Sequence, residues 1–450
     1  MQFPTILVGA SEIDMTPPVG MKLSGYFYER ISEGVILPLK ANALVLGEGD
    51  NLCALVSLDL CGLPKVEADI VRQAILRETG IPPERVMLCC THAHTGPTVR
   101  GRKDWEDVPL NVEYMDRFES LLAKVVAQAK QNQAPALVCA GMQPEEGLAF
   151  NRRFRMRDCT EQFGPNKMRP TDVNIDEDDT YCAGPAGPID TDFSVIAFKR
   201  ELTAEPFALI VNYALHVDVT SGNKITSDYP GVMREELKNV YGEGLVTLFL
   251  QGASGNINHC PYLQQSPYPH VGEWKSRQIG RAFAGKAMNI AEKALPSQSN
   301  VVKMVRTVLE VPKYPKNDQA VQDILARIKS KKPEELTFFE ESFVKRYEEY
   351  SDEGIDEREV FTLRLGEAAL CSVPGELFVE WGLEIKKWSP FKYTFIAELC
   401  NDSVGYIPTF EAIRRGGYET TPIISVRSTP ALGLMIADAN FRNLQELHAE

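Results

Sequence analysis

The sequence predicts an α/β protein that folds as one large domain. Segments with the pattern of buried strands alternate with segments that have the pattern of amphipathic helices along most of its 450 residues, as expected of α/β folds. No clear linker divides the chain, and its 44% hydrophobic and 24% charged residues are the proportions of an ordinary globular protein. A chain of this length can bury a sizeable core.

The spacing of apolar residues, together with Gly and Pro residues that end helices, predicts the strands and helices along the chain. The sequence predicts strands at 52–60, 85–92, 207–216, 245–252, 361–365, 367–373 and 393–400. It predicts helices at 65–80, 112–132, 231–241, 272–295 and 376–388. Gly80 and Pro82 end the first of these helices, and Gly366 is expected to form the turn of a hairpin.

Two segments depart from this alternation. Residues 152–190 are rich in Pro, Gly and charge and show little periodicity. We expect them to form an active-site loop, because long loops within compact domains are usually functional or disordered. Residues 312–358 are highly charged and have a helical pattern, so we expect a helical excursion on the surface rather than a second domain.

Charge and composition narrow the classes of partner. The formal net charge of −14 argues against nucleic acid and anionic membrane surfaces. No apolar run reaches the roughly 20 residues that a membrane-spanning helix needs, and residues 1–18 lack the features of a signal peptide. We therefore expect a cytoplasmic protein with a small-molecule substrate and no membrane insertion. The sequence leaves the oligomeric state open.

The ten cysteines fit the same compartment. Five of them lie within predicted strands, namely Cys53, Cys89, Cys90, Cys371 and Cys400. This placement favours buried thiols over a disulfide framework. The chain contains no CxxC motif, which argues against a structural zinc ribbon.

Histidines gather at the ends of the predicted strands. His92 and His94 come at the end of one strand, and His216 and His259 follow two others. In α/β folds, the carboxyl ends of strands are where sites form. Two histidines and a carboxylate, here Glu376 after another strand, are a common catalytic zinc set, which keeps one position open for water.

Six short motifs resemble, in order and over almost the whole chain, those of one enzyme family. They are THAHTGP (91–97), FNRR (150–153), NYALHVDVTSGNKITSDYPG (212–231), QGASGNINH (251–259), VPGELF (373–378) and NDSVGYIPT (401–409) followed by GGYE (416–419). The chain resembles the catalytic domain of the neutral ceramidases and the broader set of ceramidase-like bacterial hydrolases. The resemblance implies a fold of β-sheets sandwiched by helices.

The resemblance also implies a metal site. His92, His216, Glu376 and Tyr406 match the family's metal ligands. Zinc is the expected ion, although N and O ligands also suit Mn, Fe or Co. His94 would lie beside the metal as an acid or base.

Two further residues match groups that act on the substrate. Arg152 and Tyr418 correspond to residues that contact the substrate carbonyl or its oxyanion. The implied reaction is hydrolysis of an amide or ester by metal-activated water, since bound zinc lowers the pKa of its water to about 7. Asp218 or Asp228 could orient His216 through its second ring nitrogen.

The sequence departs from the family at the nucleophile. Asn258 stands where ceramidases carry the serine that is treated as their nucleophile, and His259 replaces the proline that follows. An asparagine cannot attack a carbonyl in this way, so we expect Asn258 to hydrogen-bond the substrate. The chain ends soon after the tyrosine motif, so we expect no C-terminal immunoglobulin-like domain.

The arginines favour a polar substrate. Arg153 and Arg414 are expected to contact a small, anionic or sugar-derived molecule, and not ceramide, because the sequence shows no apolar docking surface. Two alternatives stay open. One is a metal-dependent lyase or isomerase acting on a carbohydrate or sugar acid, which needs no side-chain nucleophile. The other is a catalytically inactive binding protein.

Overall fold

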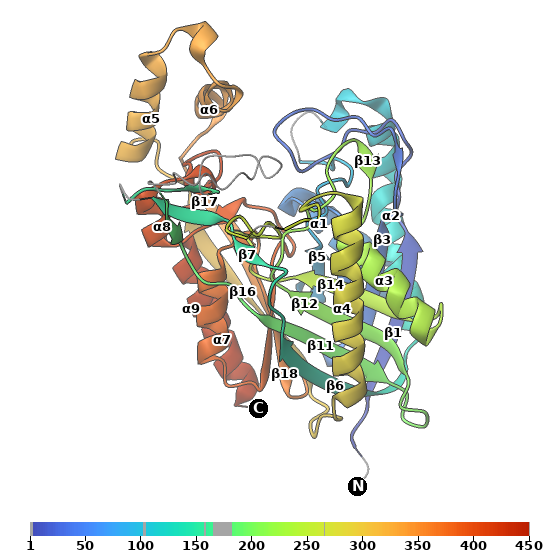
Figure 1. Cartoon of the computed structure of the whole chain (residues 1–450). Coiled ribbons are helices and arrows are strands. Elements are labelled where there is room, and N and C mark those ends of the chain that lie inside the picture. The colour runs from blue at the N-terminus through green and yellow to red at the C-terminus, as the bar shows by residue number, and fades with distance from the viewer. Residues whose placement is uncertain (1–2, 102–104, 157–158, 165–181, 265, 450) are drawn as a thin grey trace.

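Two β-sheets pack face to face, and helices cover both outer faces (Figure 1). The structure is a computed structural model that describes residues 3–101, 105–156, 159–164, 182–264 and 266–449. The prediction of an α/β fold with β-sheets sandwiched by helices is confirmed. Within the described residues, no helix is long and apolar enough to cross a membrane.

The larger sheet has eight strands and carries a βαβ unit at each edge. Its spatial order is β14 (Val246–Gln251), β12 (Pro206–Tyr213), β11 (Asp192–Lys199), β6 (Ala134–Pro144), β1 (Ile6–Asp14), β3 (Lys40–Leu46), β4 (Cys53–Leu58) and β5 (Val86–Cys90). β12 and β14 are parallel, as are β4 and β5, and a helix connects each pair. The remaining neighbours are antiparallel.

The smaller sheet supplies a third βαβ unit. Its strands are, in spatial order, β16 (Val302–Pro312), β17 (Ile355–Leu365), β18 (Ala368–Ser372) and β20 (Tyr393–Ala397). β17 and β18 form the predicted hairpin around Gly366, whose φ of 60° lies in the left-handed region. β18 and β20 are parallel and are joined through a helix.

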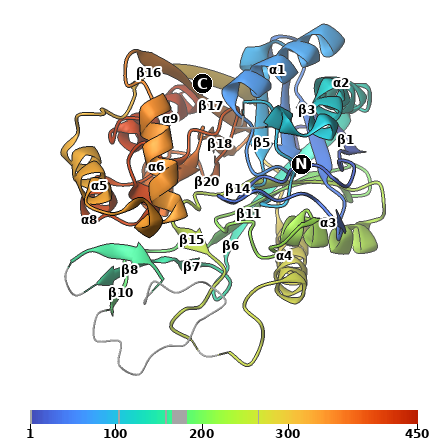
Figure 2. The same ribbon diagram turned by 90° about the horizontal axis from the view of Figure 1, so that it is seen from above.

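Helices cover these sheets because the strands bury both of their faces. The covering helices are α1 (Lys65–Thr79), α2 (Pro109–Gln131), α3 (Asp228–Tyr241) and α4 (Glu273–Lys293) on the larger sheet, with α7 (Val379–Trp388) and α9 (Leu432–His448) on the smaller (Figure 2). In β3, Val45 faces α1 and α2, whereas Leu44 and Leu46 face the smaller sheet and pack with Phe361 and Leu363. Alternate residues thus build separate cores.

The segment 152–190 contains more regular structure than its sequence indicated. Its described part forms a three-stranded sheet of β10 (Cys182–Pro185), β8 (Arg153–Met156) and β9 (Glu161–Phe163). Residues 157–158 and 165–181 of the expected loop lie outside the described residues. These strands are too short for a period-two pattern to identify them.

The segment 312–358 forms two helices, α5 (Gln319–Lys329) and α6 (Phe338–Glu349). Figure 1 shows both standing above the smaller sheet, at one end of the molecule. The segment ends earlier than expected, because β17 already begins at Ile355. Thr337 caps α6 by accepting a hydrogen bond from the backbone N–H of Glu340.

Three two-stranded pairs and a short helix complete the description. They are β2 (Gly34–Val35) with β13 (Lys224–Ile225), β7 (Phe150–Asn151) with β15 (Ile257–Asn258), β19 (Glu376–Leu377) with β21 (Tyr406–Ile407), and α8 (Phe410–Arg415). The predicted helix at 376–388 therefore begins only at Val379. The pairing of β19 with β21 sets Glu376 directly opposite Tyr406.

Candidate metal centre

The carboxyl ends of the three βαβ units converge on one point. His92 follows β5, His216 follows β12, and Glu376 follows β18. The Nε2 atoms of His92 and His216 are 2.9 Å apart. Oε2 of Glu376 lies 3.5 Å from Nε2 of His92 and 3.7 Å from Nε2 of His216. Ligands of one zinc ion lie about 3.0 to 3.5 Å apart, since each is about 2.1 Å from the metal.

Backbone carbonyls fix the tautomers of the two rings. Nδ1 of His92 donates to the carbonyl oxygen of Cys61 at 2.7 Å, and Nδ1 of His216 donates to that of Ser254 at 3.1 Å. A carbonyl can only accept, so both Nε2 atoms present lone pairs to each other. Such an arrangement is repulsive unless a cation lies between the nitrogens.

The electrostatics favour one positive charge at this point. Although burial lowers it, the pKa of His92 is raised well above its usual value by Cys61 and Glu376. Burial, with Arg152 and His92 nearby, lowers the pKa of His216 well below its usual value. Oε2 of Glu376 is buried and has no hydrogen-bond partner among the described residues. A single proton could be shared by the two Nε2 atoms. A metal ion at this point would bind both nitrogens and also Oε2 of Glu376.

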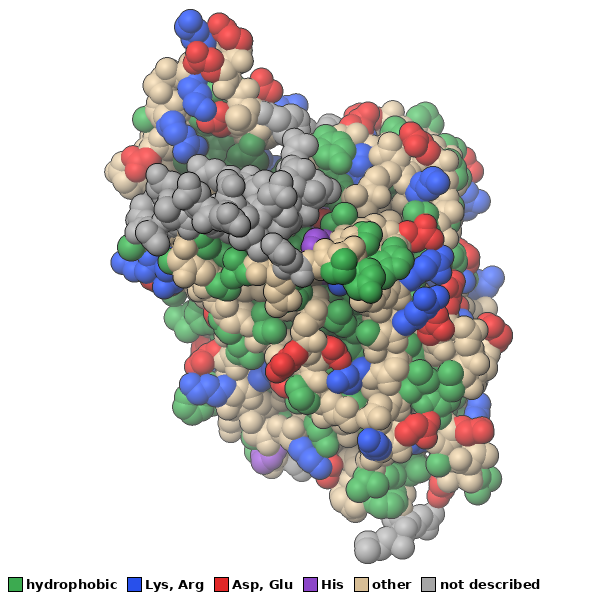
Figure 3. Space-filling model, in the orientation of Figure 1, with side chains coloured by type: hydrophobic (Ala, Val, Ile, Leu, Met, Phe, Trp, Pro, Cys, Tyr) green, Lys and Arg blue, Asp and Glu red, His purple; other side chains and the backbone are tan. Residues whose placement is uncertain are grey.

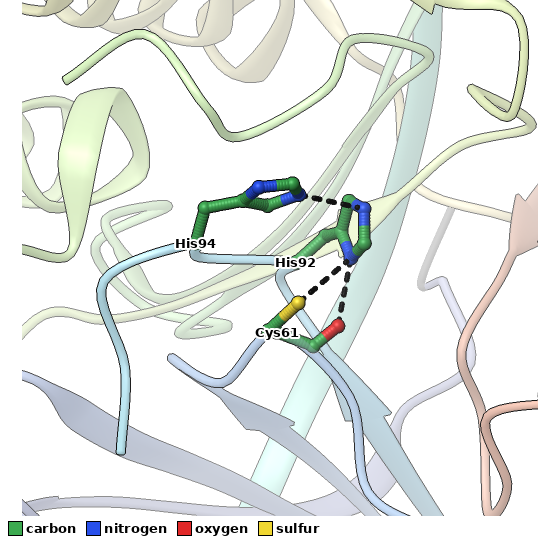
Figure 4. A group of neighbouring side chains, drawn as sticks. All are labelled: Cys61, His92 and His94. Atoms are coloured by element: carbon green, nitrogen blue, oxygen red, sulfur yellow. Dashed lines mark hydrogen bonds between the residues drawn. The ribbon is translucent and has the colours of Figure 1, made fainter. Parts of the chain in front are cut away.

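A second group of donor atoms shares His92. Cys61, His92 and His94 also lie within metal-binding distance of one another, and Figure 4 shows the three side chains together. Sγ of Cys61 is 3.8 Å from Nδ1 of His92. Because that nitrogen already donates to the carbonyl of Cys61, the group of His92, His216 and Glu376 is the better metal position.

The backbone around the histidine pair is constrained. His92 has a φ of 71°, which is strained for a residue with a side chain. Its backbone N–H donates to the carbonyl of Leu60 at 2.9 Å, which holds this conformation. Gly25 has a φ of 106°, and a Cβ there would lie 2.7 Å from Cα of His94. Glycine is therefore required where this loop crosses the site.

Tyr406 lies at the edge of the metal position and belongs to a buried polar network. Its hydroxyl is 3.0 Å from the hydroxyl of Tyr418 and accepts a hydrogen bond from Arg152, also at 3.0 Å. Burial raises the pKa of Glu376, but His92, Arg152 and a hydrogen bond from Tyr406 together lower it below its usual value. Burial and the nearby Glu376 raise the pKa of the Tyr406 phenol well above the usual pKa of a tyrosine.

Arg152 is held by three partners. Its Nε donates to Glu419 at 3.0 Å and its Nη2 donates to the carbonyl of Gly255 at 2.8 Å, in addition to Tyr406. The guanidinium is buried, and Arg152 is not among the residues that line the cavity at the metal position. These contacts suit a role for Arg152 in positioning Tyr406, and its contact with a substrate carbonyl stays a prediction.

His94 stands beside His92 and faces a carboxylate. Its Nε2 is 3.1 Å from Nε2 of His92, and its Nδ1 is 3.6 Å from Asp218. Burial raises the pKa of Asp218 to about 7, and Tyr26 hydrogen-bonds the same carboxylate. The expectation that Asp218 orients His216 is therefore wrong, because Ser254 has that position.

Asp228 does not orient His216 either. Its Oδ2 accepts hydrogen bonds from the backbone N–H groups of Val219 and Thr220, each at 2.8 Å. Its Oδ1 accepts from the N–H of Tyr229 at 2.6 Å. Asp228 therefore stabilises the turn that leads into α3.

Two predicted substrate contacts are used elsewhere in the structure. Arg153 is buried, and its guanidinium donates to Glu419 at 2.8 Å and to Glu161 at 2.9 Å. Asn258 donates to the hydroxyl of Tyr262 at 2.8 Å and accepts from the N–H of Cys260 at 3.1 Å. Neither residue lines the cavity at the metal position. In this structure both side chains make structural hydrogen bonds, and their contact with a substrate stays a prediction.

Arg414 lies on the surface outside the metal site. Its side chain is 72% exposed and pairs with Glu411 on α8. It lines a neighbouring cavity of about 620 Å³, and among the described residues Tyr418 is the one that lines both this cavity and the cavity at the metal position. Arg414 therefore lies away from the metal position, and its predicted contact with a substrate stays a prediction.

Sequence reasoning missed a buried glutamate behind the site. Oε1 of Glu398 accepts from Oγ of Ser254 at 2.6 Å, and its Oε2 accepts from the N–H of Leu377 at 2.9 Å. Burial raises the pKa of Glu398 to about 8. Glu398 thereby connects Ser254, which orients His216, with Leu377, which follows Glu376 in the chain. A carboxylate at the end of the apolar strand YTFIAELC was the available signal.

The metal position opens into a cavity of about 490 Å³. Its lining includes His92, His94, Glu376, Tyr406, Tyr418 and Cys61. Phe27 and Tyr28, which are 51% and 59% exposed, lie at the same cavity. Figure 3 shows hydrophobic side chains beside a histidine on this end of the molecule. The site therefore has an apolar rim that the sequence did not indicate.

The fold of this chain is similar to that of known solved structures. It aligns with the crystal structure of neutral ceramidase from Pseudomonas aeruginosa at a TM-score of 0.73 and 17% sequence identity, covering 100% of this chain and 75% of that chain. A structure described as ceramidase complexed with C2 gives a TM-score of 0.72 and 16% identity, with coverage of 99% and 76%. The fold is therefore that of the neutral ceramidases.

Two comparisons based on sequence find no match. No protein-family model matches this chain, and no curated protein does.

Proposed function

We propose that this protein is a metal-dependent hydrolase that cleaves an amide or ester bond of a small polar substrate. The observation that carries the proposal is the pair of Nε2 lone pairs of His92 and His216, 2.9 Å apart, beside the unpartnered carboxylate oxygen of Glu376. The fold similarity to neutral ceramidases supports hydrolysis as the reaction class. A cytoplasmic location stays a prediction.

The ligands in this proposal are His92, His216, Glu376 and Tyr406. Their N and O atoms suit zinc, which is the proposed ion. When bound, such an ion polarises a substrate carbonyl and makes water more acidic.

Within this proposal, His94 moves the proton. It lines the cavity beside His92, and its Nδ1 faces Asp218 at 3.6 Å. An imidazole with an unperturbed pKa of about 6.5 can accept a proton from the attacking water and return it to the leaving group. Asp218 would hold the ring and stabilise its charged form.

Tyr418 is the proposed donor to the oxyanion. Tyr418 lines the cavity, and its hydroxyl lies 3.0 Å from that of Tyr406. Arg152 donates a hydrogen bond to the hydroxyl of Tyr406. Its proposed role in the reaction is to hold Tyr406 and Tyr418 in position. Hydrogen-bond donors of this kind act on the charge that develops in the transition state.

The absence of the family serine supports water as the nucleophile. Asn258 makes hydrogen bonds to Tyr262 and Cys260. The nearby Ser254 is fully buried, bonded to Glu398, and does not line the cavity. The same feature would suit lyase or isomerase chemistry on a sugar acid. Solvent labelled with oxygen-18 separates the two reactions, because only hydrolysis introduces solvent oxygen into the product.

Metal analysis of the purified, tag-free protein tests the proposal first. We expect about one zinc ion per chain, and none in the double variant His92→Ala/His216→Ala, because two of the four ligands are removed. His270→Ala/His448→Ala is the matched control, since both histidines lie outside the site, and it should keep its zinc. If the wild-type protein binds no metal after reconstitution, the proposal is wrong and a binding protein becomes the better alternative.

Tyr418→Phe tests the oxyanion role. Loss of one such donor is typically worth about 3 kcal/mol, so we expect kcat to fall by about 10²-fold. The measurement is the hydrolysis of a 4-nitrophenyl ester by the zinc-loaded protein. Tyr268→Phe is the control, because Tyr268 is exposed and stacks on Trp274. A kcat within twofold of wild type would exclude Tyr418 from the chemical step.

A further inference from the structure

The cavity at the metal position has a second wall that carries no metal ligand. It is formed by Arg346 on α6 and by Ile424, Ser425 and Arg427. The sequence had placed α6 in a charged surface excursion, without a part in the site. Figure 3 shows many Lys, Arg, Asp and Glu side chains on the surface of this excursion. One of these arginines reaches the cavity.

Packing on both sides of Arg346 fixes the helix that carries it. Phe343, one turn earlier, is 1% exposed and packs in a cluster with Ile423 and Val426. Tyr350, one turn later, donates from its hydroxyl to the carbonyl of Arg427 at 3.0 Å. Residues three or four positions apart share a helix face, so Arg346 projects from the same inward face.

The other charged side chains in the described lining of the cavity do not form an ion pair with Arg346. Among the described residues of its lining, Lys22 pairs with Glu29 at 2.8 Å, and Glu376 belongs to the metal position. Arg346 is half-buried, and no carboxylate lies within ion-pair distance of it in the described part of the chain. In a protein with a net charge of −14, an arginine in a cavity without such a partner is unusual.

We propose that Arg346 binds an anionic group of the substrate, with Arg427 as a second cation on the same wall. The substrate is then an amide or ester that carries a carboxylate or phosphate away from the scissile bond. A guanidinium matches either anion with two parallel hydrogen bonds. This inference rests on the proposed function. In the reaction, water adds to the acyl carbon, the C–N or C–O bond breaks, and the proton goes to the leaving group.

The test compares two esters that differ in one negative charge, and each rate is corrected for spontaneous hydrolysis, because a free carboxylate in the same molecule can attack the ester. These are the mono-4-nitrophenyl ester of glutaric acid, which is an anion, and the same compound with its free carboxylate methylated. Zinc-loaded wild-type protein should prefer the anion in kcat/KM by about 10-fold or more, the value expected of a charge-assisted contact. Arg346→Gln should remove most of this preference, mainly by raising KM for the anion.

Lys329→Gln is the matched control. It removes one positive charge from the same excursion, at an exposed position outside the cavity, so it should keep the wild-type preference. A wild-type protein without preference for the anion, or an Arg346→Gln variant that keeps it, would overturn the inference.

Binding separates this inference from the proposed function. If zinc-loaded protein hydrolyses neither ester, the proposed function fails, and calorimetry with the monoanilide of glutaric acid and its methyl ester decides the role of Arg346. Tighter binding of the anion that is lost in Arg346→Gln would still support the anion site. Equal binding of the two compounds would reject it.

Discussion

Replacing Glu376 by Gln is expected to abolish zinc binding at micromolar metal and hydrolysis with it. The substitution keeps the shape of the side chain but removes the negative charge that faces the Nε2 atoms of His92 and His216. Residues that only support a metal ligand typically contribute about 10- to 100-fold to metal affinity. We expect loss of a direct ligand to weaken zinc binding by at least about 10²-fold.

Competition with a chelator of known affinity measures this effect, and hydrolysis of a 4-nitrophenyl ester is followed as zinc is added. At limiting zinc, the rate should fall by at least about 10³-fold, and excess zinc should restore part of it. Glu380→Gln is the control, because Glu380 is a neighbouring carboxylate that bonds Asn256 and not the metal position. Wild-type zinc affinity in Glu376→Gln would remove Glu376 from the ligand set.

Arg153→Ala is expected to destabilise the fold by about 3–5 kcal/mol. Arg153 is 1% exposed and is paired with both Glu161 and Glu419. Its removal leaves two buried carboxylates with one fewer cation, and their desolvation is then no longer offset. Glu419 also holds Arg152, so the loss extends to the support of Tyr406.

Urea denaturation followed by circular dichroism measures this loss. Arg414→Ala is the matched control, because its exposed ion pair with Glu411 should contribute no more than about 1 kcal/mol. Equal stability of the two variants would contradict the structural role of Arg153. The sequence assigned both arginines to the substrate, so this comparison also tests whether Arg153 has a structural role that Arg414 lacks.

Arg152 lies between β7 and β8, and Arg153 is the first residue of β8, so the two arginines are adjacent in the chain but differ in their contacts. Successive side chains of an extended segment point to opposite sides. Arg152 therefore reaches Gly255 and Tyr406, whereas Arg153 reaches Glu161, and only Glu419 is shared. A run of arginines in the sequence does not reveal which side faces a cavity, since that depends on segments more than 100 residues away.

The roles of Asn258 and Ser254 also follow from their contacts in the fold. Asn258 lies in the motif that carries the family's serine, yet it bonds Tyr262 four residues later. Ser254 lies in the same motif, and its backbone carbonyl orients His216. The roles of these residues follow from backbone geometry at the end of β14, which residue type alone does not determine.

The sequence determined which residues end the strands of this protein. Apolar runs of the correct length define strands, and His92, His216 and Glu376 are polar residues at their ends, so local pattern and motif order were sufficient to select them. The hairpin at Gly366 and most helices followed from the same local signals.

Only the tertiary structure decided which strand ends meet. The larger sheet brings β5 and β12 to one end of the molecule although they lie near opposite edges of it, and the packed smaller sheet adds Glu376 from β19. The distances among these atoms depend on contacts across 124 residues or more, which no local pattern encodes. The same holds for Arg346, because its place in the cavity depends on how α6 packs against residues 423–427.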